Sequence, residues 1–101
     1  MMQKPVFTTE HIAAIVKPLA DKYRLKGIYL FGSYARGEAD ENSDLDFLVF
    51  GGDMFKRTMI FALAEDLRET LKKKVDVFEI GEVNPDSDFY KTIMKEKVLV
   101  A

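Results

Sequence analysis

The sequence predicts an α/β (α+β) fold in which helices alternate with short strands. Three apolar runs have the length and composition of strands, at residues 28–31, 44–50 and 75–80. Apolar residues recur with helical spacing on two longer segments, residues 9–24 and 55–71. Because 101 residues suffice for one core and leave no room for a second, we expect residues 1–101 to form a single domain.

The first helix is expected to begin at Thr8 or Thr9, whose hydroxyl can cap it, and to run to about Arg24. Its buried stripe consists of Ile12, Ile15, Val16, Leu19, Ala20 and Tyr23. Pro18 predicts a kink or a break in the hydrogen-bond ladder. Gly27 fits a helix stop or turn.

The next segments predict two strands joined by a short helix. Residues 28–31 are apolar throughout, as in a strand buried on both faces. A helical turn is expected from Ser33 to about Gly37, followed by a polar turn at residues 39–43. The second strand covers residues 44–50, and two glycines end it.

Asp53 is a candidate cap for the next helix, which the spacing extends to residue 71. Its apolar stripe consists of Phe55, Met59, Ile60, Leu63, Ala64, Leu67 and Leu71. Three lysines, residues 72–74, close it. Their positive charges suit the negative end of the helix dipole. We prefer this interpretation to a role in binding nucleic acid.

The third strand covers residues 75–80, with Asp76, Phe78 and Ile80 on one face. After a loop, Asp86 or Ser87 can cap a short last helix. Its apolar side is expected to hold Phe89, Tyr90, Ile93 and Met94. Residues 98–100 suit a short edge strand or a packed tail.

Composition excludes several classes of protein. A formal net charge of −2, from 15 basic and 17 acidic residues, argues against direct nucleic-acid binding. No apolar run could span a bilayer and no signal-peptide pattern is present, so we expect no membrane association. With no cysteines, disulfides and thiolate metal sites are excluded, and a cytoplasmic location is the natural expectation.

Three aspartates predict a metal site. Asp44 and Asp46 are two residues apart on a strand, so their side chains share a face. Asp76 could join them if the second and third strands are neighbours in register. Adjacent carboxylates repel unless a cation lies between them, and carboxylate oxygens suit Mg²⁺. Two such ions can clamp a displacement at phosphorus.

Gly32 and Ser33 predict a phosphate site, because glycine permits close backbone approach and helix N-terminal amides bind anions. Arg36 lies one turn further along. It is a candidate nucleotide-binding residue, although pairing with an aspartate to hold the turn is the interpretation we favour.

The arrangement Gly32-Ser33, ten residues, then Asp44-Leu45-Asp46, with Asp76 on a later strand, resembles the signature of the DNA polymerase β-like nucleotidyltransferase superfamily. Chain length and the fuller form of the motif resemble its minimal nucleotidyltransferase (MNT) group. That group includes the antitoxins of HEPN/MNT toxin–antitoxin systems. The resemblance covers essentially the whole chain.

The resemblance implies a small mixed β-sheet flanked by helices, the polymerase β-like palm. It implies that Asp44 and Asp46 bind Mg²⁺, with two ions expected, and that Asp76 is the third catalytic carboxylate and metal ligand. Gly32 and Ser33 would hold the triphosphate of ATP. The implied reaction is transfer of AMP to a tyrosine of a HEPN-type toxin.

Two alternatives remain open. The protein could be an antitoxin that neutralises its toxin by binding alone. It could also modify a small molecule, as aminoglycoside-modifying relatives do, but these use an added acceptor domain or an elaborate dimer. In so short a chain, an acceptor that brings its own binding surface is the simpler inference.

Overall fold

The computed structural model describes residues 6–101. Along the chain the elements are α1 (Thr9–Lys22), β1 (Gly27–Phe31), α2 (Gly32–Ala35), β2 (Leu45–Phe50), α3 (Met59–Leu71), β3 (Val75–Glu79), the 3₁₀ turn η1 (Ile80–Glu82), α4 (Asp88–Glu96) and β4 (Val98–Leu99). The four strands form one sheet in the order β3-β2-β1-β4.

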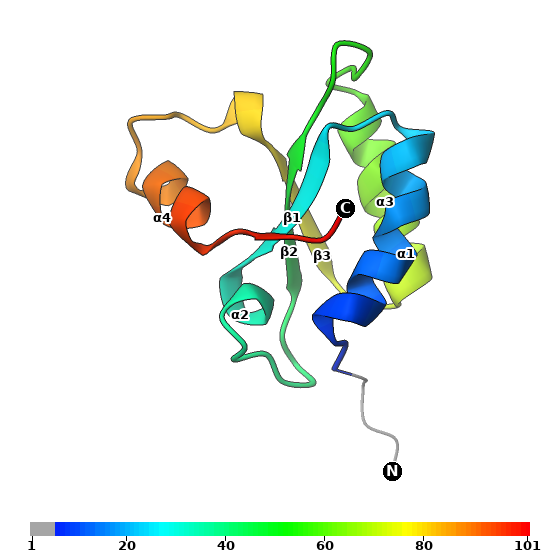
Figure 1. Cartoon of the computed structure of the whole chain (residues 1–101), viewed down its shortest axis with the longest axis vertical. Coiled ribbons are helices and arrows are strands. Elements are labelled where there is room, and N and C mark those ends of the chain that lie inside the picture. Colours follow the sequence, from blue (N-terminus) through cyan, green and yellow to red (C-terminus); the bar gives the residue numbers. More distant parts are fainter. Residues whose placement is uncertain (1–5) are drawn as a thin grey trace.

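The sheet separates two unequal layers of helices. In Figure 1 the sheet is seen nearly edge-on, with α1 and α3 on one side and α2, η1 and α4 on the other. β2 pairs antiparallel with β1 and parallel with β3, and β4 pairs antiparallel with β1. The sheet is therefore mixed and flanked by helices, as predicted.

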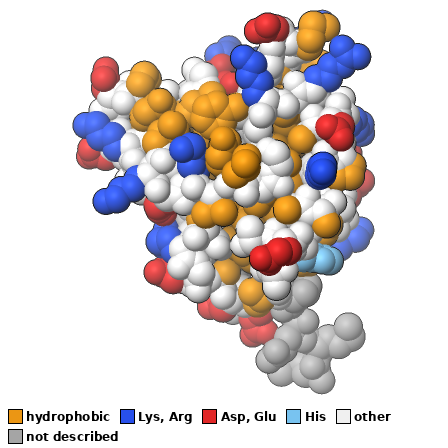
Figure 2. Space-filling view, in the orientation of Figure 1, with side chains coloured by type: hydrophobic (Ala, Val, Ile, Leu, Met, Phe, Trp, Pro, Cys, Tyr) orange, Lys and Arg blue, Asp and Glu red, His pale blue; other side chains and the backbone are white. Residues whose placement is uncertain are grey.

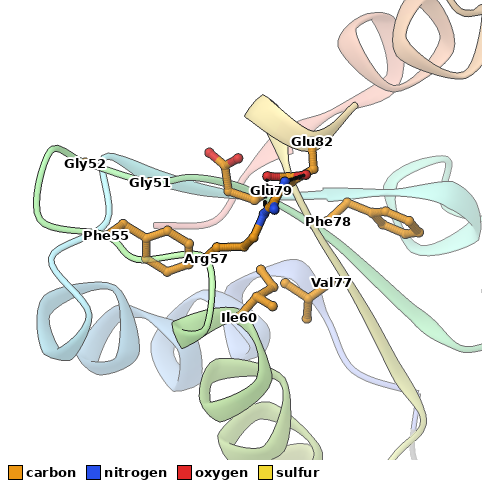
Figure 3. A pocket seen from close by; sticks show the side chains of 9 residues that line it. All are labelled: Gly51, Gly52, Phe55, Arg57, Ile60, Val77, Phe78, Glu79 and Glu82. Atoms are coloured by element: carbon orange, nitrogen blue, oxygen red, sulfur yellow. Dashed lines mark hydrogen bonds and ion pairs between the residues drawn. The ribbon is translucent and has the colours of Figure 1, made fainter. Parts of the chain in front are cut away.

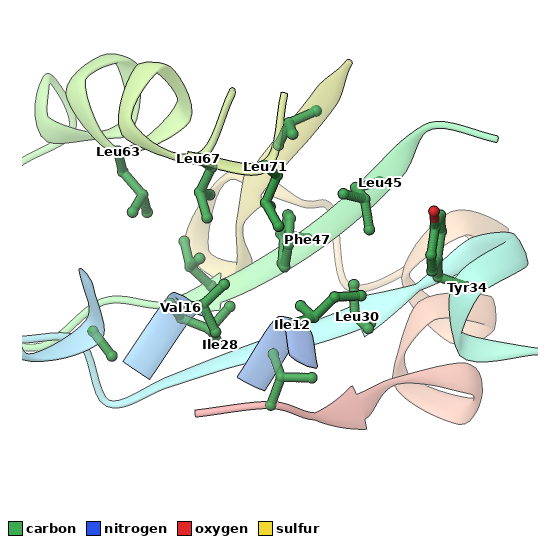
Figure 4. Close-up of a cluster of buried hydrophobic side chains, with 14 residues drawn as sticks. Ile12, Val16, Ile28, Leu30, Tyr34, Leu45, Phe47, Leu63, Leu67 and Leu71 are labelled. Atoms are coloured by element: carbon green, nitrogen blue, oxygen red, sulfur yellow. The ribbon is translucent and has the colours of Figure 1, made fainter. Parts of the chain in front are cut away.

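The main core lies between the sheet and the α1–α3 layer (Figure 4). Alternate residues of β2, among them Leu45 and Phe47, face this layer and are fully buried. Leu63 and Leu67 of α3 meet them from the helix side. Burying one such side chain contributes about 1.5–3 kcal/mol, so this layer supplies most of the apolar stabilisation that holds β2 in place.

The opposite face of the sheet has a smaller core and carries the candidate site. Phe31 of β1, Leu48 of β2 and Ile93 of α4 are buried there together. Residues two positions apart on a strand share a face, so Asp46 lies on the same side of β2 as Leu48. The aspartate thus lies beyond the end of a small apolar cluster.

Two helix caps follow the sequence prediction. The Thr8 side chain accepts a hydrogen bond from the His11 amide at 3.1 Å, and the Ser87 hydroxyl accepts one from the Tyr90 amide at 3.0 Å. α1 continues through Pro18, so the proline does not end the helix. The predicted edge strand at the C-terminal end is confirmed as β4.

Three local predictions are wrong. Asp53 does not cap α3, because residues 51–58 form turns and the helix begins at Met59. Gly27 is not the helix stop: it pairs with Phe50 as the first residue of β1, and Arg24, with φ 52°, makes the turn instead. β2 begins one residue later than predicted, which leaves Asp44 just before the strand.

Among the described residues, no helix has both the length and the apolar character required to cross a membrane.

Candidate active site

Asp46 and Asp76 face each other across two neighbouring strands. They are register partners in the parallel β2–β3 pair, and Phe31 is the partner of Asp46 on β1. Adjacent strands lie about 4.8 Å apart, so the two carboxylates project side by side from the sheet. The structure therefore brings together two of the three predicted carboxylates, from segments thirty residues apart.

Gly32 joins the end of β1 to α2 and lies directly against Asp46. Its φ is +73°, a backbone conformation that other residues rarely adopt. A Cβ at this position would lie 2.5 Å from Asp46 Oδ2. Glycine is thus required twice, for the turn and for the close approach of the carboxylate.

Ser33 follows as the second residue of α2, so it lies in the helix's only turn. The first amides of a helix have no partners within it and point outward along its axis. The glycine–serine turn and the Asp46–Asp76 pair therefore adjoin, as the predicted phosphate and metal sites should.

Asp44 is near this pair but is not joined to it. Its Oδ2 lies 3.9 Å from the Lys74 ammonium nitrogen, and its side chain is 43% exposed. Within residues 6–101, no three His, Cys, Asp or Glu side chains are grouped closely enough to hold a metal ion as they stand. The three-carboxylate cluster expected from the sequence is therefore only partly assembled.

Burial, together with the neighbouring carboxylates, marks Asp46 as the centre of the site. Burial raises the pKa of the Asp46 carboxyl to about 6, with further increases from the charges of Asp76 and Asp44 and an opposing effect from Arg36. Burial and nearby like charges both disfavour the charged form of a carboxyl. A cation beside Asp46 would favour that form.

The donor set fits a divalent cation. Asp46 and Asp76 supply oxygen ligands from a rigid sheet, and Mg²⁺ accepts one or two carboxylates together with phosphate oxygens. Releasing Asp44 from Lys74 costs little, because an exposed ion pair of this kind contributes about 0–1 kcal/mol. The ion pair with Lys74 is therefore only a weak obstacle to a different orientation of the Asp44 side chain.

Arg36 is engaged by two glutamates. Its Nη1 donates to Glu96 Oε1 at 2.8 Å, and its Nε donates to Glu38 Oε1 at 3.0 Å. These bonds connect α2 to the end of α4. The predicted pairing of Arg36 with an aspartate is wrong, because both partners are glutamates. Whether Arg36 holds the turn or contacts the nucleotide stays a prediction.

Sequence reasoning did not foresee an aromatic cluster beside the carboxylates, formed by Phe31, Phe78 and Phe89. Their ring centroids lie 5.3–5.8 Å apart. Side-chain alternation along β3 puts Phe78 on the same face as Asp76, and this was the only part of the cluster that the sequence indicated. Nothing local indicated that the ring of Phe89, from α4, would meet it.

A separate cavity of about 350 Å³ lies near the other end of the sheet (Figure 3). The loop after β2 and the end of β3 line it, and the Arg57 guanidinium crosses it to Glu82, with Nη2 2.6 Å from Oε2. Neither Asp46 nor Asp76 borders this cavity. It is therefore distinct from the carboxylate site.

Residues 13–101 match the family described as "Polymerase beta, Nucleotidyltransferase". The match includes the glycine–serine turn and all three aspartates. The chain belongs to this nucleotidyltransferase family.

One relative of this nucleotidyltransferase is Protein adenylyltransferase MntA of Thermococcus cleftensis, which is 33% identical over 99 residues and covers 94% of this chain and 98% of the relative. A solved structure described as a minimal nucleotidyltransferase is 26% identical, with a TM-score of 0.74, over 91% of this chain and 95% of that one.

A further solved structure contains a tri-AMPylated HEPN toxin of Shewanella oneidensis in complex with its MNT antitoxin. The matched chain has a TM-score of 0.70 and 20% identity, over 93% of this chain and 72% of that one. At this identity the likeness shows the shared fold. The predicted palm-like fold and the nucleotidyltransferase family are thus both confirmed.

Proposed function

We propose that this nucleotidyltransferase transfers AMP from ATP to a hydroxyl of a protein partner, as the antitoxin of a HEPN-type toxin. The observation that carries the proposal is the facing pair Asp46–Asp76 against the Gly32 turn. The relative from Thermococcus, named as a protein adenylyltransferase, supports the protein acceptor. The AMPylated toxin in the Shewanella complex supports its class.

In this proposal the backbone at Gly32 and Ser33 receives the triphosphate. Asp44, Asp46 and Asp76 would hold Mg²⁺, with two ions expected, which supplies charge neutralisation for the phosphates. Asp76 also orients the attacking hydroxyl and takes up its proton. The acceptor oxygen forms a bond to the α-phosphorus, the bond from that phosphorus to the bridging oxygen breaks, and pyrophosphate leaves.

Arg36 acts in this scheme by holding α2 in place. Its Nε and Nη1 donate to glutamates, and its charge lowers the pKa of Asp46. A nucleotide contact through either of these two nitrogens would compete with a glutamate. We therefore place Arg36 outside the residues that hold phosphate.

The test is intact-mass analysis of a HEPN-type partner after incubation with this protein, ATP and magnesium. The expected result is a gain of one or more AMP units, mapped to tyrosine by peptide sequencing. The Asp46→Asn variant should bind the partner and transfer nothing. An unmodified partner, with nucleotide and metal shown to be bound by the enzyme, would contradict the proposal.

The second candidate, neutralisation by binding alone, is favoured by one observation: Asp44 is turned toward Lys74 and the carboxylate cluster is not preassembled. The Asp44→Asn, Asp46→Asn double variant separates the two functions. If it still protects cells from the toxin, binding suffices. If it binds the toxin but no longer protects, catalysis is required.

A further inference from the structure

The aromatic cluster of Phe31, Phe78 and Phe89 continues directly from the carboxylate pair. Phe31 is the register partner of Asp46, and Phe78 lies two residues beyond Asp76 on the same face of β3. Two residues of strand span roughly 6.6 Å. That distance matches the ribose that separates the α-phosphate of a nucleotide from its base.

The cluster is unusually exposed for three contacting phenylalanines. Phe31 is 7% exposed and forms its floor, whereas Phe78 and Phe89 are 39% and 41% exposed. Figure 2 shows hydrophobic side chains reaching the surface around η1 and α4, with charged side chains around them. The two partly exposed rings adjoin each other, so together they offer an apolar surface on which a ligand can pack.

The rings of the cluster meet one another at steep angles. The three pairs are inclined by 55–76°, so no ring of the cluster stacks face to face on another. Phe78 also lines the separate cavity, where its ring points away from Phe55 and Arg57 (Figure 3). A planar aromatic ligand lying beside Asp76 would meet ring faces and edges.

We propose that this cluster is the platform on which the base of the bound nucleotide stacks. The inference rests on the proposed function, because it requires a triphosphate at Gly32 and Asp46. A nucleobase is favoured over a partner's side chain because the cluster begins beside the carboxylates, one ribose length away. Stacking on phenylalanine uses the π-face that every base has.

Such a platform makes a prediction for the unmodified protein. Recognition by stacking discriminates by stacking strength and not by hydrogen-bond pattern. The ATP and GTP analogues should bind with Kd values within about threefold of each other, and the smaller ring of UTP should bind more weakly. A strong preference for ATP over GTP would overturn the platform as the main base contact.

Calorimetric titration with α,β-methylene-ATP and magnesium tests the residues. Phe78→Leu and Phe89→Leu keep apolar bulk but remove the ring, and each should raise the Kd by about tenfold. Inorganic triphosphate, which has no base, should bind these variants as it binds the unmodified protein. Phe61→Leu is the matched control, since Phe61 is 75% exposed on α3, in the opposite helix layer.

The other outcomes separate the two proposals. If the unmodified protein binds neither the analogue nor triphosphate, the proposed function fails and the platform with it. If it binds both equally well, the function stands and the platform is refuted. If the variants bind the analogue normally but transfer no AMP to a protein partner, the cluster docks the acceptor and the platform is again refuted. Thermal unfolding of each variant confirms that it is folded.

Discussion

Asp46 is the residue at which function and stability conflict. Its carboxyl is partly buried next to Asp76, and its pKa is raised to about 6. At pH 7 the folded protein must therefore hold a charge that its surroundings disfavour. We expect Asp46→Asn to increase the free energy of unfolding of the metal-free protein by about 1 kcal/mol, after discounting for solvent screening.

The measurement is thermal unfolding, where a gain of this size raises the midpoint by about 4–8 °C. Asp53→Asn, at an exposed turn position, is the control and should leave the midpoint unchanged. The same Asp46 variant should abolish nucleotidyl transfer. A loss of stability in Asp46→Asn would show that the carboxylate is not strained.

The gain also depends on pH in a defined direction. Because the folded-state pKa of Asp46 lies above the ordinary value of 3.8, its ionisation destabilises the folded state. Below about pH 4 the carboxyl is protonated in both states, so the variant and the unmodified protein should be equally stable. The difference should grow between pH 4 and 6 and stay constant above that, as urea titrations at several pH values would measure.

Gly32 permits a second test at the residue scale. Alanine there suffers the strain of φ +73° and places a Cβ 2.5 Å from Asp46 Oδ2. We expect Gly32→Ala to cost at least about 1–2 kcal/mol of stability and to abolish transfer. Gly37 has the same φ but no atom within 4 Å of its added Cβ, so Gly37→Ala should show the strain alone and retain activity. Equal losses in urea denaturation would contradict the close contact.

At the scale of elements, the Arg36–Glu96 bond is the contact that ties α2 to α4. If Arg36 is structural, Arg36→Gln and Glu96→Gln should lower stability alike and only slightly, as expected of an exposed ion pair, and should affect KM for ATP alike. If Arg36 binds phosphate, only its own variant will raise KM. A double-mutant cycle, with stability and steady-state kinetics measured in parallel, distinguishes the two.

The helix and strand predictions succeed where the signal is local. Thr8 and Ser87 cap their helices because a hydroxyl one residue before the first turn can reach the amides there. Asp53 had the same chemistry but no helix beside it, since residues 51–58 are taken up by turns. Gly27 belongs to β1 because it pairs with Phe50. No local sequence pattern predicts that contact.

At the scale of the whole molecule, metal binding should stabilise the fold. A cation held by Asp46 and Asp76 binds the folded state only, and at ten times its Kd it adds about 1.4 kcal/mol. We expect magnesium to raise the unfolding midpoint of the unmodified protein but not of the Asp46→Asn, Asp76→Asn double variant. Sodium chloride at matched ionic strength is the control, and an equal shift with it would refute a specific site.

The local elements of this protein follow from its sequence. Side-chain alternation, helical spacing and the interval from Gly32 to Asp46 depend on neighbouring residues, so they can be recognised in one dimension. Packing in three dimensions sets which elements meet: Asp76 lies opposite Asp46, Glu96 binds Arg36, and three phenylalanines lie beside the carboxylates. Strand register and helix docking set these contacts, and both depend on packing between segments far apart in the chain.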